Sequence, residues 1–212
     1  MEIFLETERL VLRAFTAADA ENLHELNADP DVTWYVTGGE PTPRDVVETQ
    51  LIPRFLGFHE RSDWQGYWAA ETKRDREFLG WFHVLPEADG VVDLGYRLRK
   101  AAWNRGYATE ASRAIIDHCF AERRVRRITA HALAVNVPSR RVMEKCGMTR
   151  TGTYQPGSLP DIPGADQGAV AYALTRDQWA SRALRPAGVM LGAARKPDRA
   201  NKNMPGNLTS CR

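Results

Sequence analysis

The chain has 212 residues, of which 43% are hydrophobic and 26% charged, and its formal net charge is +2. This balance is typical of a soluble globular protein and argues against an intrinsically disordered or membrane-embedded class. The small net charge argues against a nucleic-acid partner. The cysteines Cys119, Cys146 and Cys211 are scattered and form no CxxC pair, so we expect neither a disulfide framework nor a metal site.

The first residues, MEIFLETERLVLRAF, contain acidic side chains and no long apolar run, so they resemble neither a signal peptide nor a membrane anchor. We therefore expect a cytoplasmic protein without a membrane partner. The length fits one domain, which we expect over residues 1–184. From residue 185 to residue 212 the sequence is basic, rich in Gly, Pro and Asn, and without periodicity, which predicts a mobile tail.

Hydrophobic periodicity predicts a strand and two helices in the first third of the chain. Alternation of apolar and polar residues predicts a strand over Arg9–Phe15, and the spacing of Thr16–Leu26 predicts a helix. Prolines and glycines predict a loop over Asp29–Pro43. A second helix is expected over Arg44–Glu60, bent at Pro53.

The rest of the chain alternates between strands and helices. Three strands in close order predict an antiparallel meander over Gly66–Thr72, Phe78–Leu85 and Val91–Leu98. After them we expect a helix, a strand, a short helix that Gly147 ends, and two closing strands, over Tyr107–Glu122, Arg126–Val135, Pro138–Cys146, Met148–Tyr154 and Ala169–Leu174.

The stretch WNRGYATEA, residues 103–111, places a glycine where a helix begins. Free N–H groups at a helix start, together with the helix dipole, attract anions, and a glycine lets the backbone approach phosphate oxygens. Residues 104–108 are therefore a candidate cradle for a pyrophosphate, with cationic charge nearby on Arg99, Lys100 and Arg105. The alternative is a simple turn before a helix. The patterns GxxxxGK[ST] and GxGxxG are absent, so the stretch matches neither nucleotide-binding motif.

Two longer runs, VVDLGYRLRKAAWNRGYATEASRAIIDHCF and RITAHALAVNVPSRRVMEKCGMTRTG, carry a family resemblance, together with the opening ETERLVLRAF and the DPDVTWYV loop. They resemble the GCN5-related N-acetyltransferase (GNAT) superfamily, and within it the ribosomal-protein N-terminal acetyltransferase branch, from Glu8 to about Trp179. Trp103 stands where the superfamily often has Gln or Arg, as is common in that branch. The resemblance implies an α/β fold with a mixed, mostly antiparallel sheet of six to seven strands and about four flanking helices.

The resemblance also implies acetyl-coenzyme A as the cosubstrate. Its pyrophosphate is expected on Asn104, Arg105, Gly106, Tyr107 and Ala108, with Thr109 adjacent. The pantetheine arm is expected to pair like an extra strand with Leu98 and Arg99. Asn136 corresponds to a family asparagine whose side chain meets the pantetheine. The alternative for Asn136 is a turn at the end of a strand, for which asparagine is well suited.

In such enzymes an amine attacks the thioester carbonyl, a tetrahedral oxyanion forms against a backbone N–H, and coenzyme A leaves as a thiolate. Many superfamily members carry a tyrosine, seven residues after the asparagine, that gives a proton to the sulfur. Here that position is Met143. We therefore expect Ser139 to be the donor, with a serine in the first turn of a helix as the equally weighted alternative.

Two residues are candidates for the base that takes a proton from the amine. His131 precedes Asn136 by five residues, where some relatives carry a glutamate, and a histidine suits proton transfer near neutral pH. Asp93 shares a strand face with Gly95 and Arg97 if Val92, Leu94 and Tyr96 point to the core. A solvated Asp93–Arg97 pair and a proton relayed through water are the alternatives.

The resulting hypothesis is an acetyl-coenzyme A dependent N-acetyltransferase that acts on a primary amine, with a protein N-terminus as one candidate acceptor. A non-catalytic acyl-coenzyme A binding module is the alternative, and a nucleotide-binding enzyme that uses the same glycine turn is a third hypothesis. The acceptor is expected to be chosen by the segments 29–43 and 154–167. Whether the protein forms a homodimer is left open.

Overall fold

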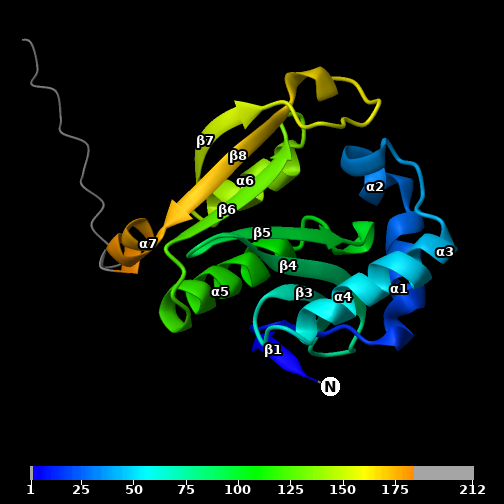
Figure 1. Cartoon of the computed structure of the whole chain (residues 1–212), viewed down its shortest axis with the longest axis horizontal. Coiled ribbons are helices and arrows are strands. Elements are labelled where there is room, and N and C mark those ends of the chain that lie inside the picture. Colours follow the sequence, from blue (N-terminus) through cyan, green and yellow to red (C-terminus); the bar gives the residue numbers. More distant parts are fainter. Residues whose placement is uncertain (1, 184–212) are drawn as a thin grey trace, which may run out of the picture.

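The computed structural model describes residues 2–183, so the predicted tail over residues 185–212 lies outside the described residues. Eight strands form one sheet in the order β1-β2-β3-β4-β5-β6-β8-β7 (Figure 1). Their bounds are β1 Ile3–Glu6, β2 Leu10–Ala14, β3 Gly66–Thr72, β4 Phe78–Ala88, β5 Val91–Leu98, β6 Arg127–Leu133, β7 Thr149–Tyr154 and β8 Ala169–Thr175. All pairs are antiparallel except β5 with β6, which confirms the mixed, mostly antiparallel fold class.

The helices are α1 Ala20–Ala28, α2 Pro30–Thr37, α3 Arg44–Val46, α4 Ile52–His59, α5 Tyr107–Glu122, α6 Val137–Lys145 and α7 Arg176–Ala183. Short 3₁₀ turns cover Ala17–Asp19, Lys100–Ala102 and Ala165–Gln167, and a π-helical segment covers Val47–Leu51. Among residues 2–183, no helix has the length and apolarity that a bilayer crossing requires.

The main core lies between the sheet and α5. The α5 side chains Ala111, Ile115 and Cys119 are fully buried and pack in one cluster with Trp68 and Phe82 of β3 and β4. A second cluster covers the other face of the N-terminal strands, where side chains of α1 and α4 pack on β3. Both faces of β3 and β4 are therefore covered, and β3 is buried along its whole length.

Strands β5 and β6 pair over only three residues and then part. The parallel register joins Val91 to Arg127, Val92 to Ile128 and Asp93 to Thr129. Beyond Asp93, β5 continues along β4 to Leu98, while β6 continues along β8 to Leu133. Figure 1 shows the two halves of the sheet diverging between these strands. The parted edges have no strand to pair with, which marks the place where a ligand can supply hydrogen bonds.

Most predicted elements are confirmed, but the sheet has one strand more than expected and the segment 29–43 is not a plain loop. It contains α2, in which Asp29 accepts a hydrogen bond from the Asp31 N–H and Pro30 occupies the first turn. Proline at that position starts a helix without losing a hydrogen bond, so the proline was read wrongly as a breaker. The sequence analysis also missed β1 and α7.

The two segments that the sequence singled out for acceptor choice pack against each other. Ile162 and Ala165 of the connection between β7 and β8 are buried in a small apolar cluster with Leu133, and Tyr35 of α2 packs against it. In Figure 1, α2 and this connection lie near each other at the open end of the sheet. Together they cover the region beyond the end of β6.

A buried ion cluster ties β2, β3 and the approach to α1 together. The guanidinium of Arg13 pairs with Asp19 at 2.7 Å and also with Glu71, and all three side chains are at most 7% exposed. Asp19 also accepts from the backbone N–H and the hydroxyl of Thr16 at the turn that leads into α1. Such a cluster holds α1 in place on the sheet.

We predict that Asp19→Asn lowers the free energy of unfolding by about 3 kcal/mol, because a buried Arg13 then loses one of its partners. Burial raises the pKa of Asp19, but hydrogen bonds from Arg13 and Thr16 outweigh it and hold the pKa below its usual value. The stabilisation is therefore present above the unfolded pKa of about 3.9 and is lost as the pH falls through the folded pKa.

Urea unfolding of the unchanged protein and of Asp19→Asn, at pH 7 and below pH 4, checks this prediction. The difference between their free energies of unfolding is expected to shrink in acid. Glu21→Gln is the matched control, because its pair with Arg44 is exposed. A control that destabilises as much as Asp19→Asn would contradict the role of burial.

Candidate active site

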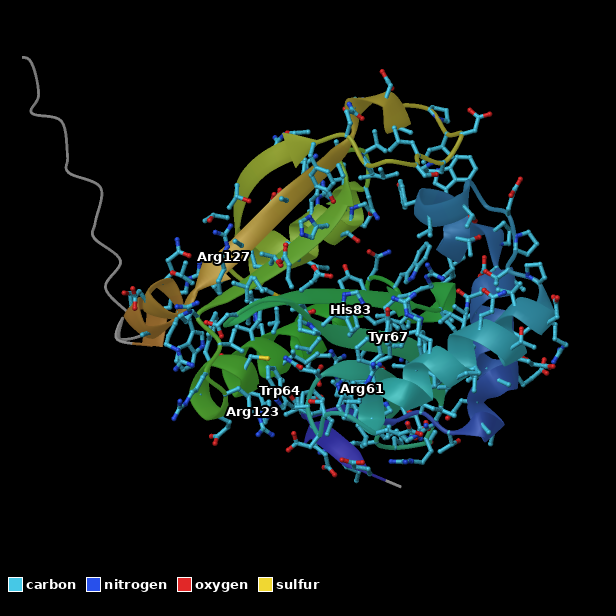
Figure 2. The ribbon with its side chains drawn as sticks, viewed as in Figure 1. Arg61, Trp64, Tyr67, His83, Arg123 and Arg127 are labelled. Atoms are coloured by element: carbon cyan, nitrogen blue, oxygen red, sulfur yellow. The ribbon has the colours of Figure 1, made fainter. Side chains whose placement is uncertain are left out.

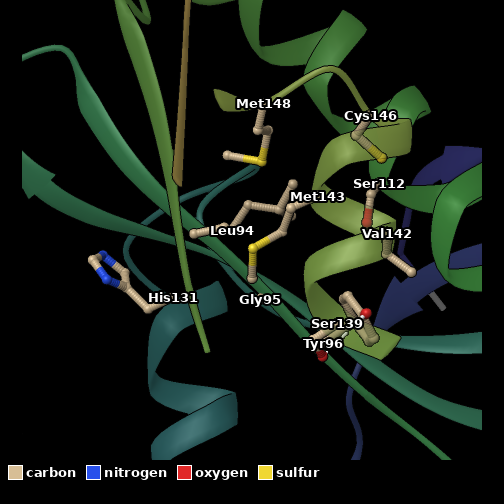
Figure 3. A pocket seen from close by; sticks show the side chains of 11 residues that line it. Leu94, Gly95, Tyr96, Ser112, His131, Ser139, Val142, Met143, Cys146 and Met148 are labelled. Atoms are coloured by element: carbon tan, nitrogen blue, oxygen red, sulfur yellow. Dashed lines mark hydrogen bonds between the residues drawn. The ribbon is translucent and has the colours of Figure 1, made fainter. Parts of the chain in front are cut away.

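A pocket opens where β5 and β6 part (Figure 3). Its empty volume, including the solvent at its mouth, is about 390 Å³. The lining residues come from β5, β6, α5, α6 and the turn after α6, and they are Leu94, Gly95, Tyr96, Ser112, Ala130, His131, Ser139, Val142, Met143, Cys146 and Met148. The pocket brings together His131 and Ser139, two of the candidate catalytic residues.

The start of α5 has no side-chain cap. Gly106 precedes the helix with φ +83°, in the left-handed region that favours glycine, and no side chain accepts a hydrogen bond from the first-turn N–H groups. Asn104 is also left-handed, at φ +58°. The amides of Tyr107, Ala108 and Thr109 are therefore not covered by a capping side chain, as an anion cradle requires.

The turn between β1 and β2 holds this helix start. The carboxylate of Glu110 accepts hydrogen bonds from the Thr7 hydroxyl at 2.6 Å and from the Arg9 N–H at 2.9 Å, and it pairs with the Arg9 guanidinium at 2.6 Å. Arg9 also lies over the Tyr107 ring and donates to the Arg105 carbonyl. Because Glu110 is occupied by these partners, it does not cap its own helix.

The cations around the cradle differ from those expected. Lys100 pairs with Asp31 of α2, and Arg99 pairs with Glu25 of α1, so both side chains are held by helices on the other face of the sheet. Arg105 lies 5.1 Å from the centre of the Tyr107 ring. The cations near Gly106 are therefore Arg105 and Arg9, of which the second was missed.

The edge of β5 that faces the pocket is formed by alternate residues. The Arg99 N–H donates to Leu79 of β4 at 2.7 Å, and its carbonyl accepts from Ala102, so both backbone groups of Arg99 have partners. By the alternation of a strand, Leu94, Tyr96 and Leu98 turn their backbone groups to the parted side. The Leu98 carbonyl accepts from the indole N–H of Trp103 at 2.8 Å and keeps a second lone pair.

On the α6 side of the pocket, Tyr96 and Ser139 meet across the parted strands. The Tyr96 hydroxyl donates to the Ser139 hydroxyl at 3.4 Å (Figure 3). Asn136 caps α6, since its side-chain oxygen accepts from the Ser139 N–H at 3.2 Å. Asn136 thus has the structural role weighed in the sequence analysis, and its amide nitrogen is left without a hydrogen bond to residues 2–183.

Burial raises the pKa of Tyr96, and the hydrogen bond to Ser139 opposes that shift only in part. The phenol therefore stays protonated at neutral pH and can donate. Met143 is 6% exposed and lines the same pocket. The pocket therefore has a thioether at the position where the family resemblance implies a tyrosine hydroxyl. Burial also raises the pKa of Cys146 to about 11, which keeps this pocket thiol neutral.

The opposite face of the sheet carries five polar and aromatic side chains in a row from β3 to β7, and we call Tyr67, His83, Asp93, His131 and Tyr154 the polar row. His83 Nε2 lies 2.8 Å from Asp93 Oδ2, and His131 Nε2 lies 3.9 Å from Asp93 Oδ1. His131 Nδ1 and the Tyr154 hydroxyl are 3.2 Å apart. Figure 2 shows His83 and Tyr67 next to each other, with ring centres 5.5 Å apart.

The polar row places both candidate bases in one network. Asp93 does share a face with Gly95, because His83 pairs with Gly95 in the register and contacts Asp93. Asp93 pairs with the two histidines, and no ion pair with Arg97 occurs among the described residues. Asp93 Oδ1 and His83 Nδ1 are buried without hydrogen-bond partners, which points to a site where a further polar group fits.

Sequence reasoning missed His83, Tyr96 and Arg9. On β4 the buried Phe82 and Val84 alternate with Trp81 and His83, so the face of His83 was readable once the strand was expected. The other two contacts depend on which elements lie side by side, and no local pattern gives that. Among residues 2–183, no cluster of His, Cys, Asp and Glu could hold a metal ion.

Comparisons with known proteins agree with this geometry. The family model described as an acetyltransferase (GNAT) domain matches residues 9–149. The Bacillus subtilis protein YkkB is 34% identical over 74% of this chain and 91% of its own length. An Aspergillus fumigatus protein named FsC-acetyl coenzyme A-N(2)-transacetylase is 27% identical over 82% of this chain and 77% of its own length.

Among solved structures, a GNAT-family acetyltransferase from Bacillus anthracis is 25% identical, with a TM-score of 0.68 over 82% of this chain and 98% of that chain. RimL, a ribosomal L7/L12 alpha-N-protein acetyltransferase in complex with coenzyme A, is 18% identical, with a TM-score of 0.70 over 84% of this chain and 99% of that chain. Since the family model spans most of the described residues, the chain belongs to the GNAT family of acetyl-coenzyme A dependent N-acetyltransferases.

Proposed function

We propose that this enzyme binds acetyl-coenzyme A in the opening between β5 and β6 and transfers the acetyl group directly to a primary amine. The uncapped start of α5 would hold the pyrophosphate through the amides of residues 107–109, with Gly106 allowing close approach. The free edge of β5 would hold the pantetheine as an added strand. The accepting primary amine can be the N-terminal amine of a protein or the amine of a small molecule.

The observation that carries this proposal is that the pocket joins two different proton-transfer groups from opposite faces of the sheet. Ser139 and Tyr96 line it from the α6 side, and His131 lines it from the side of the polar row. In Figure 3, His131 lies beyond the strands as seen from Ser139 and Met143. A thioester lying between the strands would have a donor on one side and a base on the other, which a module that only binds acyl-coenzyme A does not need.

Ser139 is the proposed donor to the leaving sulfur. Its hydroxyl accepts from Tyr96, so a proton given by Ser139 to the thiolate can be replaced from the tyrosine. Tyr96 remains a donor at neutral pH because burial raises its pKa. In this arrangement the pair of hydroxyls takes the role of the tyrosine that Met143 replaces.

His131 is the proposed base, and Asp93 supports it. If His131 Nδ1–H donates to the Tyr154 hydroxyl, Nε2 keeps its lone pair. Asp93 Oδ1 lies 3.9 Å from Nε2 and is buried without a hydrogen bond to residues 2–183. After Nε2 takes the proton from the amine, the carboxylate of Asp93 stabilises the charged ring.

We predict that Gly106→Val weakens coenzyme A binding by roughly 10- to 100-fold, since the side chain strains a φ of +83° and obstructs hydrogen bonds to a charged phosphate. Calorimetric titration with coenzyme A checks it. Gly38→Ala is a matched control, because Gly38 has φ +74° at the end of α2, far along the chain from the cradle. Unchanged affinity in Gly106→Val would contradict the placement of the pyrophosphate.

Ser139→Ala is expected to lower kcat on the order of 10²-fold with little change in the affinity for acetyl-coenzyme A, because a general acid acts in the transition state. Tyr96→Phe should lower kcat by less, and the double variant should lose no more than Ser139→Ala alone if the two hydroxyls act in series. Thiol release under saturating acetyl-coenzyme A measures all three. Ser181→Ala, on the exposed face of α7, is the control. Additive losses would argue against a relay.

His131→Ala is expected to lower kcat/KM for the amine on the order of 10²-fold at pH 7. The loss should shrink as the pH rises, since a larger fraction of the free amine is then already neutral. Values of kcat/KM from pH 6 to 10 with one amine check this prediction. Asp93→Asn is measured in the same way, because Asp93 is proposed to support His131. A loss that is the same at every pH would indicate a structural role for His131.

A single assay separates the enzyme from a non-catalytic binding module. The protein is incubated with acetyl-coenzyme A and a panel of N-terminal peptides, amino acids, polyamines and aminoglycosides, and thiol release is followed. Release that depends on one of these amines supports the transferase. Tight binding of coenzyme A with no release from any amine would favour the binding module.

A further inference from the structure

Arg97 is a partly buried arginine on β5 that has no carboxylate partner among the described residues. Its guanidinium donates to the side-chain oxygen of Asn27, a fully buried residue of α1, and lies 5.5 Å from the centre of the Trp81 ring. Neither neighbour carries a charge. Burial lowers the pKa of Arg97, which is the direction expected for a cation removed from water without an anion.

Among the described residues, some shielded arginines have anionic partners, whereas the partly buried Arg140 and Arg176 donate to backbone carbonyls instead. Arg13 pairs with Asp19 and Glu71, and Arg99, two residues beyond Arg97 on the chain, pairs with Glu25. A buried charge without a counter-ion is costly, so proteins pair such groups. Arg97 has neither a carboxylate nor a backbone carbonyl as a side-chain partner among residues 2–183, so its guanidinium keeps N–H groups that an anion can fill.

The surroundings of Arg97 carry opposite charges at two places. Burial raises the pKa of Tyr67, the charges of Arg54 and Arg97 oppose that shift, and the charge of Asp93 adds to it. Arg54 lies over the Tyr67 ring, 5.6 Å from its centre. The carboxylate of Asp93 keeps one buried oxygen without a hydrogen bond. The face of the sheet next to the pocket therefore offers one anion near the parted strands and two cations, Arg97 on β5 and Arg54 on α4.

The separation of these charges suits a small zwitterion. Arg97 and Gly95 share a face of β5, and Gly95 lines the pocket. Two residues along a strand span roughly 7 Å. An amine that reaches the pocket at Gly95 would therefore have Arg97 within the length of a short molecule.

We propose that Arg97 is the subsite for a carboxylate of the acceptor, so that the preferred acceptors are small amines of the amino-acid class rather than purely cationic amines or protein N-termini. This inference rests on the proposed function, because it assigns the acceptor of that same site. The amine is directed to the pocket beside Asp93 and His131, and the carboxylate is bound by the guanidinium, with Arg54 nearby. An acceptor without an anion would leave Arg97 buried and unpaired.

The test compares amines that differ only at the carboxylate. Phenylalanine, phenylalaninamide and phenethylamine form one set, and lysine, lysinamide and cadaverine form another. Thiol release gives kcat/KM for each, corrected for the fraction of neutral amine. We expect the carboxylate form to be preferred by about 10- to 100-fold within at least one set, as a charge-assisted hydrogen bond allows.

Arg97→Gln should remove that preference by raising KM for the amino acid, with little effect on the amide. Arg97→Lys keeps the positive charge but lacks the planar guanidinium with its two parallel N–H donors, so it should keep part of the preference. Arg61→Gln is the matched control, because Arg61 is an exposed arginine at the end of α4 that donates to the Gly57 carbonyl. It should keep the full preference. Circular dichroism and the affinity for coenzyme A show whether Arg97→Gln is folded.

Equal rates for the three members of both sets, or an equal loss for all of them in Arg97→Gln, would overturn the carboxylate subsite and leave the transferase standing. No thiol release from any amine would count against the proposed function instead. In that case calorimetric titration of the amino acid and its amide into the complex with coenzyme A still decides the subsite. Binding that prefers the amino acid and is lost in Arg97→Gln supports it, and equal or absent binding rejects it.

Discussion

The parting of β5 and β6 is the constraint on which the rest of the site depends. Three pairs of residues join the strands, and beyond Asp93 each strand follows a different neighbour. Backbone groups along the parted edges need hydrogen bonds, and water or an extended ligand must supply them. The same separation opens a pocket through the sheet, so that groups from both of its faces reach one place. An acetyltransferase needs this, because one proton leaves the amine and another can be given to the sulfur.

Contacts between distant segments hold this opening in position. Glu110 in the first turn of α5 is bound by Thr7 and Arg9, which fixes the helix start against the turn between β1 and β2. That arrangement leaves the first amides of α5 without a side-chain cap. On the other face, the buried cluster around Arg13 holds α1, and Asn27 of α1 in turn accepts from Arg97. The start of α5 and the helix α1 are therefore each fixed by charged groups.

The two faces of the opening differ in chemistry. The side of α6 is mostly apolar, with Met143 and Cys146 around a pair of hydroxyl groups. A thioester and its leaving sulfur suit such a lining, because a neutral thiol is a soft and weakly hydrated group. The other face carries the polar row and Arg97, which suit an amine and a charged acceptor. In the proposed mechanism, the sheet thus separates a cofactor side from an acceptor side.

The sequence by itself determined most of the strands and helices between β2 and β8, the glycine-led start of α5 and the family, since these depend on periodicity and on a short motif, but it missed β1, α2 and α7. It also gave Asp93 a place on the face opposite the core, because alternation within a strand is a local property. Only the tertiary structure decided that β5 leaves β6 after Asp93, that Tyr96 meets Ser139, that His83 joins Asp93, and that Arg97 has no counter-ion within residues 2–183. These contacts join residues 10 to 70 positions apart in the chain, so they depend on strand register and helix packing, which no local pattern specifies.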